Sequence, residues 1–314
     1  MRRERLGGML AYITRRCAQA LLVIVGVSVV VFFLARLAPS DPVTLMLSET
    51  ASPQQIVEAR HYYGFDRPIP YQYWLFVSRA ARGNLGDSLY YKQPAFNVVM
   101  EAFPETLKLA FVAFLIAIAV AIPLGILAAV KRDTLWDYLA VGVAVLGQAA
   151  PPYWIGIVLI LIFAVRLRLL PTSGNDGPDA IILPAVTLAA ALMAVLARLT
   201  RAGMLDVLNE DFIRTARAKG VRERSVLYRH ALRNVLIPLV TVMGLQLGAL
   251  LGGAVIIEQV FAWPGVGRLA VTAITARDYP IIQAVVLLVS CVFVVVNLAV
   301  DLLYGFLDPR IRYQ

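Results

Sequence analysis

The chain has 314 residues, of which 60% are hydrophobic and 16% are charged, and its mean hydropathy is +0.75. This composition excludes an ordinary soluble globular protein and predicts an integral membrane protein. The net charge of +9 would also suit nucleic-acid binding, but in a membrane protein basic residues more often mark the cytoplasmic side and contact anionic lipid headgroups.

Six stretches are apolar and long enough to cross a bilayer as helices, since a hydrocarbon core of about 30 Å needs about 20 residues. They are residues 17–38, 104–130, 137–165, 181–202, 235–260 and 281–303. We therefore predict an all-α integral membrane fold with six transmembrane helices. The third stretch contains Pro151 and Pro152, which remove backbone donors and predict either one bent span or a span with a short re-entrant piece.

The distribution of Arg and Lys predicts how these spans are oriented. The basic stretch MRRERLGGMLAYITRRC precedes a first span that is too long for a cleavable signal peptide, and no A-x-A site follows it. This places residues 1–16 in the cytoplasm, and six crossings then place the loop 203–234 and the tail 304–314 there too. The rule that basic residues stay inside is obeyed on balance, because a few arginines fall outside, namely Arg166, Arg168, Arg268 and Arg277.

Residues 39–103 form the one sizeable loop predicted on the outer side, after the first span. Ser52, Pro53 and Gly64 predict a short helix over its stretch SPQQIVEARHYYG, with a capping residue at the start and a glycine stop at the end. The loop suits either a small lid packed on its own spans or a docking surface for another protein.

The segment DFIRTARAKGVRERSVLYRHALRN, residues 211–234, carries seven Arg or Lys and two acidic residues between two apolar spans. Asp211 is expected to cap a helix that ends at Gly220, where a left-handed residue is needed. A second amphipathic helix is expected to start near Glu223. This segment suits three kinds of partner: anionic lipid, DNA or a cytoplasmic protein. Docking on a protein is favoured. A helix that only contacts lipid does not need the break at Gly220, and a segment tethered to the membrane at both ends cannot readily enter a DNA groove.

Seven motifs follow one another from Gly83 onward. They are GNLGDS, PETLKLA, RTARAKG, HALRN, FAWPGVGRL, RDYPIIQ and VDLLYGFLDPRIRY. Together they resemble permease subunits of bacterial ABC importers, of the dipeptide, oligopeptide and nickel branch. The general pattern of the cytoplasmic loop of these permeases, EAA-x3-G-x9-I-x-LP, aligns on Gly220. It is matched at Ala216, Gly220 and Leu232, while Arg214 and Thr215 replace its first two residues.

The resemblance implies a transport subunit of the bacterial cytoplasmic membrane that is not itself an enzyme. Its implied partners are a second homologous permease, cytoplasmic subunits that bind ATP and Mg, an extracytoplasmic solute-binding protein and membrane lipid, with no nucleic acid. The residues implied to couple it to the ATPase are Asp211, Arg214, Thr215, Ala216, Arg217, Gly220 and Leu232. The sequence agrees in lacking a G-x4-GK[ST] phosphate-binding loop, so no cofactor is expected on this chain.

Within the predicted permease core, residues 104–303, a few positions are candidates for the pathway wall. Gly244, Gly248 and Gly252 repeat every four residues and predict a close helix contact, within the chain or with the second permease. Gln246, on the other side of that helix, is then expected to face a hydrated lumen. Gln148 beside Pro151 is a candidate substrate contact, since a proline break exposes carbonyl groups.

Other polar residues in the apolar stretches are expected to reach the membrane interface. Glu258 lies near a span end, and Arg198 and Arg201 lie at the inner end of the fourth span. His61 and His230 fall on opposite sides of the membrane and cannot share a site, so no catalytic or metal site is expected. Cys17 and Cys291 lack metal-ligand spacing and are interpreted as packing residues.

The expected cargo, by the resemblance, is a di- or oligopeptide. Nickel chelates and other small peptides such as glutathione are carried by members of the same branch and remain alternatives. A self-powered secondary transporter is the rival class, but it would normally show inverted repeats and paired ionisable groups near the bilayer midplane. Inspection of the sequence finds neither.

Overall fold

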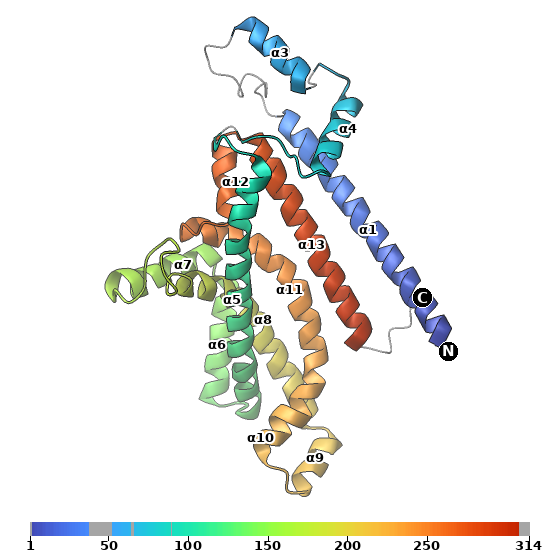
Figure 1. The fold of residues 1–314 in the computed structure, drawn as a ribbon. Coiled ribbons are helices and arrows are strands. Elements are labelled where there is room, and N and C mark those ends of the chain that lie inside the picture. Colours follow the sequence, from blue (N-terminus) through green and yellow to red (C-terminus); the bar gives the residue numbers. More distant parts are fainter. Residues whose placement is uncertain (1, 38–51, 64–65, 89, 308–314) are drawn as a thin grey trace. The chain divides into compact units, whose positions relative to one another are not determined.

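A computed structural model of the chain describes residues 2–37, 52–63, 66–88 and 90–307. Figure 1 shows the order of its helices. They are α1 (Arg2–Leu37), α3 (Pro53–Tyr63), α4 (Ile69–Ala80), α5 (Ala95–Val130), α6 (Leu135–Ala149), α7 (Pro152–Leu159), η1 (Ile160–Arg166), α8 (Ile182–Leu208), α9 (Asp211–Ala218), α10 (Glu223–Ser225), η2 (Val226–Ala231), α11 (Leu232–Val260), α12 (Val266–Thr275) and α13 (Tyr279–Leu307). The two η elements are π-helical turns, and no strand occurs among the described residues. The all-α prediction is confirmed.

Five of the helical runs are long and apolar enough to cross a membrane. They are Thr14–Phe33, Ala95–Val130, Ile182–Leu208, Glu223–Val260 and Tyr279–Val300. A sixth is obtained if Leu135–Ala149 and Pro152–Arg166, which meet at an angle of 111°, count as one broken span. The structure therefore has five or six candidate spans, and the sharply bent pair fits both alternatives predicted for the third stretch, a bent span or a span with a re-entrant piece.

The bend in the third span lies where the two prolines predict it. Ala150 and Pro151 adopt extended backbone angles, with ψ values of 134° and 137°. Proline lacks an N–H donor and disfavours the helical region for the residue before it, so two consecutive prolines interrupt the helix. Pro152 then begins α7, because a proline is tolerated in the first turn of a helix.

Short helices outside the spans differ in how well the sequence predicts them. α3 confirms the helix expected over SPQQIVEARHYYG, although its stop, Gly64, lies outside the described residues. α4 lies in the outer loop, where the sequence analysis predicts no second helix. The second helix of the basic segment starts at Glu223 as expected, but it continues through η2 directly into α11.

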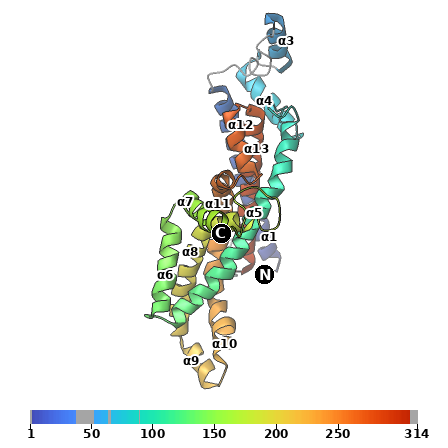
Figure 2. The same cartoon turned by 90° about the vertical axis from the view of Figure 1, so that its left-hand side faces the viewer.

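The chain divides into two compact units. The first comprises Met1–Pro104, Gly265–Leu298 and Tyr313–Gln314, and the second comprises Glu105–Pro264 and Ala299–Arg312. In the second unit α8 is the central helix, which packs on α6, α7 and α11 (Figures 1 and 2). Its core is made largely of alanines and leucines such as Ala185, Leu192 and Leu196, so the helices approach closely.

In the first unit, a buried polar cluster ties the loop before α5 to the start of α13. Asp278 is fully buried and accepts a hydrogen bond from the Ser88 hydroxyl at 2.5 Å and one from the Tyr90 backbone N–H at 3.2 Å. Its other oxygen accepts from the backbone N–H of Ile281 at 3.4 Å, which caps α13. Apolar residues of α5, α12 and α13, including Val99, pack beneath this cluster.

Candidate functional site

The basic segment 211–234 forms a compact helical hairpin at the end of α8. α9 begins one residue earlier than a cap at Asp211 would require: Glu210 has the extended backbone of an N-cap, with φ −70° and ψ 150°. The predicted cap is therefore wrong. Asp211 lies in the first helical turn, where its charge suits the helix dipole, and its carboxylate is 3.5 Å from Arg214.

The turn after α9 is built around Gly220, as predicted. Gly220 has φ +74°, the left-handed region that residues with a side chain rarely adopt. Its N–H donates to the Arg217 carbonyl at 3.0 Å, and the Val221 N–H donates to the Ala216 carbonyl at 3.2 Å. These two bonds form a Schellman motif, which satisfies the last carbonyls of the helix and reverses the chain.

An ion pair closes the hairpin from its exposed side. Arg217 in α9 donates from Nη2 to Glu223 Oε1 at 2.7 Å and from Nε to Oε2 at 3.2 Å. These hydrogen bonds to a carboxylate raise the pKa of Arg217 above its ordinary value, so the guanidinium stays charged. A planar guanidinium facing a carboxylate in this way fixes direction as well as distance.

Apolar residues on the inner face of the hairpin attach it to the core of the second unit. Ile213, Ala216, Val226 and Ala231 are buried in that core, and Leu232 packs against it. Two of the residues predicted to contact a partner, Ala216 and Leu232, therefore serve to hold the hairpin against its own spans. A force on α9 would be passed to the ends of α8 and α11.

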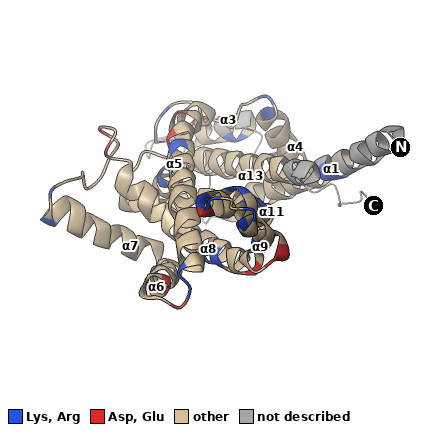
Figure 3. Ribbon diagram, turned by 90° about the horizontal axis from the view of Figure 1, so that it is seen from below, with Lys and Arg blue, Asp and Glu red and all other residues tan. Residues whose placement is uncertain are grey.

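The opposite face of the hairpin is basic and carries two exposed aromatic rings. Figure 3 shows basic positions gathered beside the start of α11. Phe212 is 44% exposed and Tyr228 is 47% exposed. All seven basic residues of the segment are exposed, namely Arg214, Arg217, Lys219, Arg222, Arg224, Arg229 and Arg233. Aromatic anchors among arginines are typical of a surface that binds another protein. The prediction omitted the two rings, although an aromatic residue inside a charged segment was a usable signal.

An ion pair between Arg201 and Asp137 lies near the C-terminal end of α8, the end that leads into the hairpin. Arg201 Nε and Nη2 donate to the two carboxylate oxygens of Asp137 at 2.6 and 2.7 Å. The Asp137 side chain is only 4% exposed, and it also accepts from the Asp133 N–H at 3.1 Å. The expectation that Arg201 reaches out to the cytoplasm is wrong, because a carboxylate 64 positions away satisfies it. Arg198, one turn earlier, is exposed.

Two glycines let other helices approach this same end of α8. A Cβ at Gly125 of α5 would lie 2.5 Å from the Cβ of Thr200, and a Cβ at Gly203 would lie 2.7 Å from Val235 of α11. Only glycine fits at such contacts. α5, α6 and α11 are thus all held against the turns of α8 that lead into the hairpin.

The glycines proposed for a helix interface divide between two environments. A Cβ at Gly244 would lie 2.4 Å from Val300 of α13, so this glycine serves a contact within the chain. Gly248 is buried, whereas Gly252 is exposed with no atom within 4 Å of a Cβ placed there. The three do not form a single contact.

A small cavity of about 110 Å³ lies beside the break in the third span. Its lining includes Gln246 and Thr187 together with Gly147 and Pro152, which flank the break. The predicted neighbours Gln148 and Pro151 are exposed and do not line it. The structure thus brings Gln246 to the break but turns Gln148 away from it.

Glu258 differs from the sequence expectation. It is fully buried and accepts a hydrogen bond from the Thr106 hydroxyl of α5 at 2.6 Å. It therefore does not extend to the membrane interface, because a neighbouring helix supplies a hydrogen-bond donor.

Among the described residues no group of three or more His, Cys, Asp or Glu could hold a metal ion. His61 donates from Nδ1 to the Asp66 carboxylate at 2.8 Å, outside the spans. The hydrogen bond to His61 holds the pKa of Asp66 below its ordinary value, against the opposing effect of desolvation.

Comparison with known proteins gives matches along most of the chain. Residues 121–313 match the family described as binding-protein-dependent transport system inner membrane component, and residues 9–110 match the N-terminal component of the same systems. The glutathione transport system permease protein GsiC of Escherichia coli strain K12 is 44% identical over 306 residues, which is 98% of this chain and 100% of that protein. The di/tripeptide transport system permease protein DppB of Pseudomonas aeruginosa strain UCBPP-PA14 is 41% identical, with 98% and 100% covered.

Solved structures share the fold of the permease core. A methionine ABC transporter, MetNI, in an inward-facing conformation matches with a TM-score of 0.58 and 18% identity, covering 67% of this chain and 96% of that chain. An amino acid ABC transporter with histidines matches with a TM-score of 0.50 and 16% identity, covering 68% and 94%. Taken with the family match and the apolar helices, these findings confirm the resemblance: the chain belongs to the family of inner-membrane components of binding-protein-dependent transport systems, the multi-pass permeases of ABC importers.

Proposed function

We propose that the chain forms half of a translocation pathway for di- or oligopeptides, in an importer whose ATP is bound and hydrolysed by other subunits. The hairpin 211–234 seats in a groove of a cytoplasmic ATPase subunit. The observation that supports this most is its two-faced construction: an apolar face attached to the spans, and a basic face with Phe212 and Tyr228 exposed. A helix that only lay on lipid would turn its apolar face to the bilayer.

Each residue of the proposed coupling site then has a distinct role. Asp211, Arg214 and Thr215 are exposed and would contact the ATPase. Gly220 and the Arg217–Glu223 pair set the angle of the hairpin. Ala216 and Leu232 hold it on the spans, so that closure of the ATPases around ATP and Mg moves α8 and α11 together.

The assembly contains a second, homologous permease, two ATP-binding subunits and an extracytoplasmic solute-binding protein. In this arrangement residues 1–16 and 304–314 and the coupling loop 203–234 lie in the cytoplasm. Residues 17–38 form the first span, 39–103 the outer loop that faces the binding protein, and 104–303 the permease core. The exposed Gly252 is suited to the contact with the second permease, and Gln246, which lines the small cavity, to contact with solute in the pathway.

The cargo proposed first is a di- or tripeptide, after the DppB relative. Glutathione is the second candidate, because GsiC relatives match at 44% identity. Both are small peptides, so one pathway chemistry serves either. Competition assays distinguish the two cargoes. Uptake of labelled dipeptide is measured with unlabelled glutathione present, and uptake of labelled glutathione is measured with unlabelled dipeptide present.

The proposal is tested by gentle purification of the tagged chain from its native membrane, followed by mass spectrometry of the proteins that accompany it. We expect an ATPase and a second permease, and the binding protein retained with them should bind the transported solute. Solute transport by the chain alone in vesicles, with no companion protein, would contradict the proposal and favour a secondary transporter.

A further inference from the structure

α11 contains a proline in its interior, and the helix is weakened there. Pro238 has no N–H, so the carbonyl of Asn234 has no helical donor, although the backbone stays helical through this turn. The Thr241 hydroxyl donates back to the Ile237 carbonyl at 3.0 Å in the same stretch. Back-bonding by a threonine loosens a helix and favours bending. α11 is therefore easier to bend at Pro238 than elsewhere along its length.

Before the proline, α11 is packed tightly against α8. Val235 is only 1% exposed, and a Cβ at Gly203 of α8 would lie 2.7 Å from it. Val226 and Ala231, at the two ends of η2, are buried in the same core, and η2 itself contacts α8. The end of α8, the hairpin and the first turns of α11 thus form one closely packed part, residues 203–237, which we call the hairpin block.

Past the proline, α11 packs against α8 more loosely. The small cavity of about 110 Å³ lies between the two helices here, and its lining includes Gln246 and Leu250 of α11 and Leu192 of α8. A Cβ placed at Gly253 would meet Leu188 of α8 at 3.4 Å, which is an ordinary contact. Closely packed helices leave few voids larger than a water molecule, so this part of α11 has room to change its angle to α8.

The same part of α11 has its closest contact with a different helix. Gly244 lies against Val300 of α13, at a distance that excludes any side chain on the glycine. These two residues and Pro238 all belong to the second compact unit. α11 is thus fixed to α8 on one side of Pro238 and to α13 on the other, with its most easily bent turn between the two contacts.

We propose that Pro238 is a joint at which movement of the hairpin block becomes a bend of α11 within the permease core. When the ATPase subunits close, the hairpin block moves as one part, while α11 beyond Pro238 stays with α13. The angle between the two parts changes, and so does the width of the cavity that Gln246 lines. The inference rests on the proposed function, because it requires the hairpin to be moved by an ATPase.

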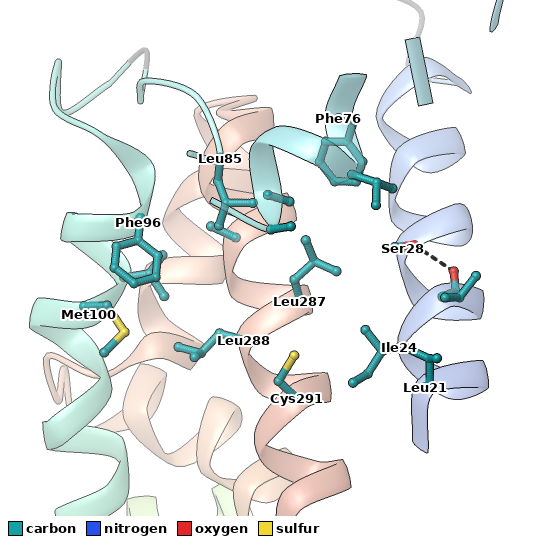
Figure 4. Close-up of a pocket in the computed structure, with 16 residues that line it drawn as sticks. Leu21, Ile24, Ser28, Phe76, Leu85, Phe96, Met100, Leu287, Leu288 and Cys291 are labelled. Carbon is teal, nitrogen blue, oxygen red and sulfur yellow. Dashed lines mark hydrogen bonds between the residues drawn. The ribbon is translucent and has the colours of Figure 1, made fainter. Parts of the chain in front are cut away.

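The test measures distances between pairs of spin labels in the complete transporter. Cys17 and Cys291 are first replaced by serine; Cys291 lines an apolar cavity of the first unit (Figure 4). Labels at the exposed positions Asp206 of α8 and Ile256 of α11 report across the joint. We expect their distance to differ between the nucleotide-free transporter and the transporter trapped with ATP and vanadate. Labels at Asp206 and Ile182, both on α8, are the control and should keep a constant distance.

Pro238→Ala restores the missing N–H donor and stiffens the helix. Pro238 is exposed, so the exchange removes no core contact. The distance between the labels at Asp206 and Ile256 should then no longer respond to nucleotide, and most of the uptake should be lost while ATP hydrolysis persists. Pro238→Gly also restores the donor but leaves the helix easily bent, so it should keep more of both. Pro123→Ala makes the same exchange at an exposed proline inside α5 and should change neither.

A nucleotide response that is undiminished in Pro238→Ala, or normal uptake by this variant, would overturn the proposal. The ATPase subunit should stay bound to every variant, because the surface of the hairpin is unchanged. Failure of the joint with the ATPase subunit still bound would leave the proposed docking intact. A permease that binds no ATPase subunit in any form would contradict the proposed function and this inference with it.

Discussion

Gly220 shows how a single backbone conformation shapes the hairpin. Its φ of +74° is favourable only for glycine, yet a Cβ there would meet no atom within 4 Å. A larger residue is therefore not excluded by contact but by the roughly 1–2 kcal/mol cost of the left-handed region. The consequence of a substitution is a changed direction of α9, with the spans intact.

We predict that Gly220→Val abolishes solute uptake while ATP hydrolysis and membrane insertion persist, because the hairpin no longer transmits movement in the right direction. Uptake into vesicles and ATPase activity are measured on the same preparation. Gly220→Asn is the matched control, since asparagine tolerates the left-handed region and should keep much of the coupling. Normal uptake by the valine variant would argue against the role of the turn.

Asp278 is the second residue whose geometry leads to a prediction. Its carboxylate is buried and accepts from Ser88, Tyr90 and Ile281, so its loss leaves buried donors unpaired. Asp278→Ala should destabilise the first unit by about 2 kcal/mol, the usual range for hydrogen bonds to a charged group.

The measurement is the thermal unfolding midpoint of the purified transporter. Asp87→Ala, which removes an exposed carboxylate from the same loop, serves as the control and should leave the midpoint unchanged. Equal midpoints for the two variants would show that the cluster does not hold the loop.

At the scale of elements, the inner end of α8 is the point where the core and the hairpin meet. Gly125 and Gly203 permit close contacts with α5 and α11, and the Asp137–Arg201 pair joins α6. A buried pair contributes little net stability when intact, but removing one partner leaves an uncompensated charge. The pair is therefore better interpreted as fixing the position of α6 than as a source of stability.

Asp137→Ala should reduce the amount of assembled transporter and lower the uptake obtained per ATP hydrolysed, since Arg201 loses the carboxylate that fixes its position. The exchange Asp137→Arg with Arg201→Asp should restore both in part. Arg198→Ala, one turn away and exposed, is the control. An exchange variant no better than the single variant would contradict a role for this pair.

Local rules predicted the elements well and their contacts poorly. The apolar runs predicted the spans, Pro151 and Pro152 predicted the break, and Gly220 predicted the turn. All three features depend on residues that are adjacent in sequence. The 111° bend, the burial of Glu258 by Thr106 and the pairing of Asp137 with Arg201 join positions far apart in sequence. Ser88 and Asp278 belong to two motifs noted separately, GNLGDS and RDYPIIQ, and only the fold shows that they meet.

The coupling site shows the same division. Its segment, its glycine and its basic character follow from the sequence. Which residues face outward depends on how the hairpin packs on the spans, so Ala216 and Leu232 were grouped with exposed residues and Phe212 and Tyr228 were missed.

In the proposed assembly, the hairpin is the part of the molecule that contacts the partner ATPase. Exposed aromatic rings among basic residues are where most of the binding free energy is expected. Phe212→Ala with Tyr228→Ala should weaken the association with the ATPase subunit by roughly 2 kcal/mol or more, about 30-fold. The fraction of ATPase retained by the tagged permease is the measurement, and Trp154→Ala, an exposed aromatic residue of α7, is the control.

In the proposed assembly, residues 211–234 contact an ATP-binding subunit on the cytoplasmic side. The most direct measurement places a photo-reactive phenylalanine analogue at position 212 in living cells and identifies the cross-linked protein by mass spectrometry. We predict an adduct with the ATPase subunit that is absent when the analogue is placed at position 154. An adduct with an extracytoplasmic protein, or modification of position 212 by a reagent that cannot cross the membrane, would contradict the account.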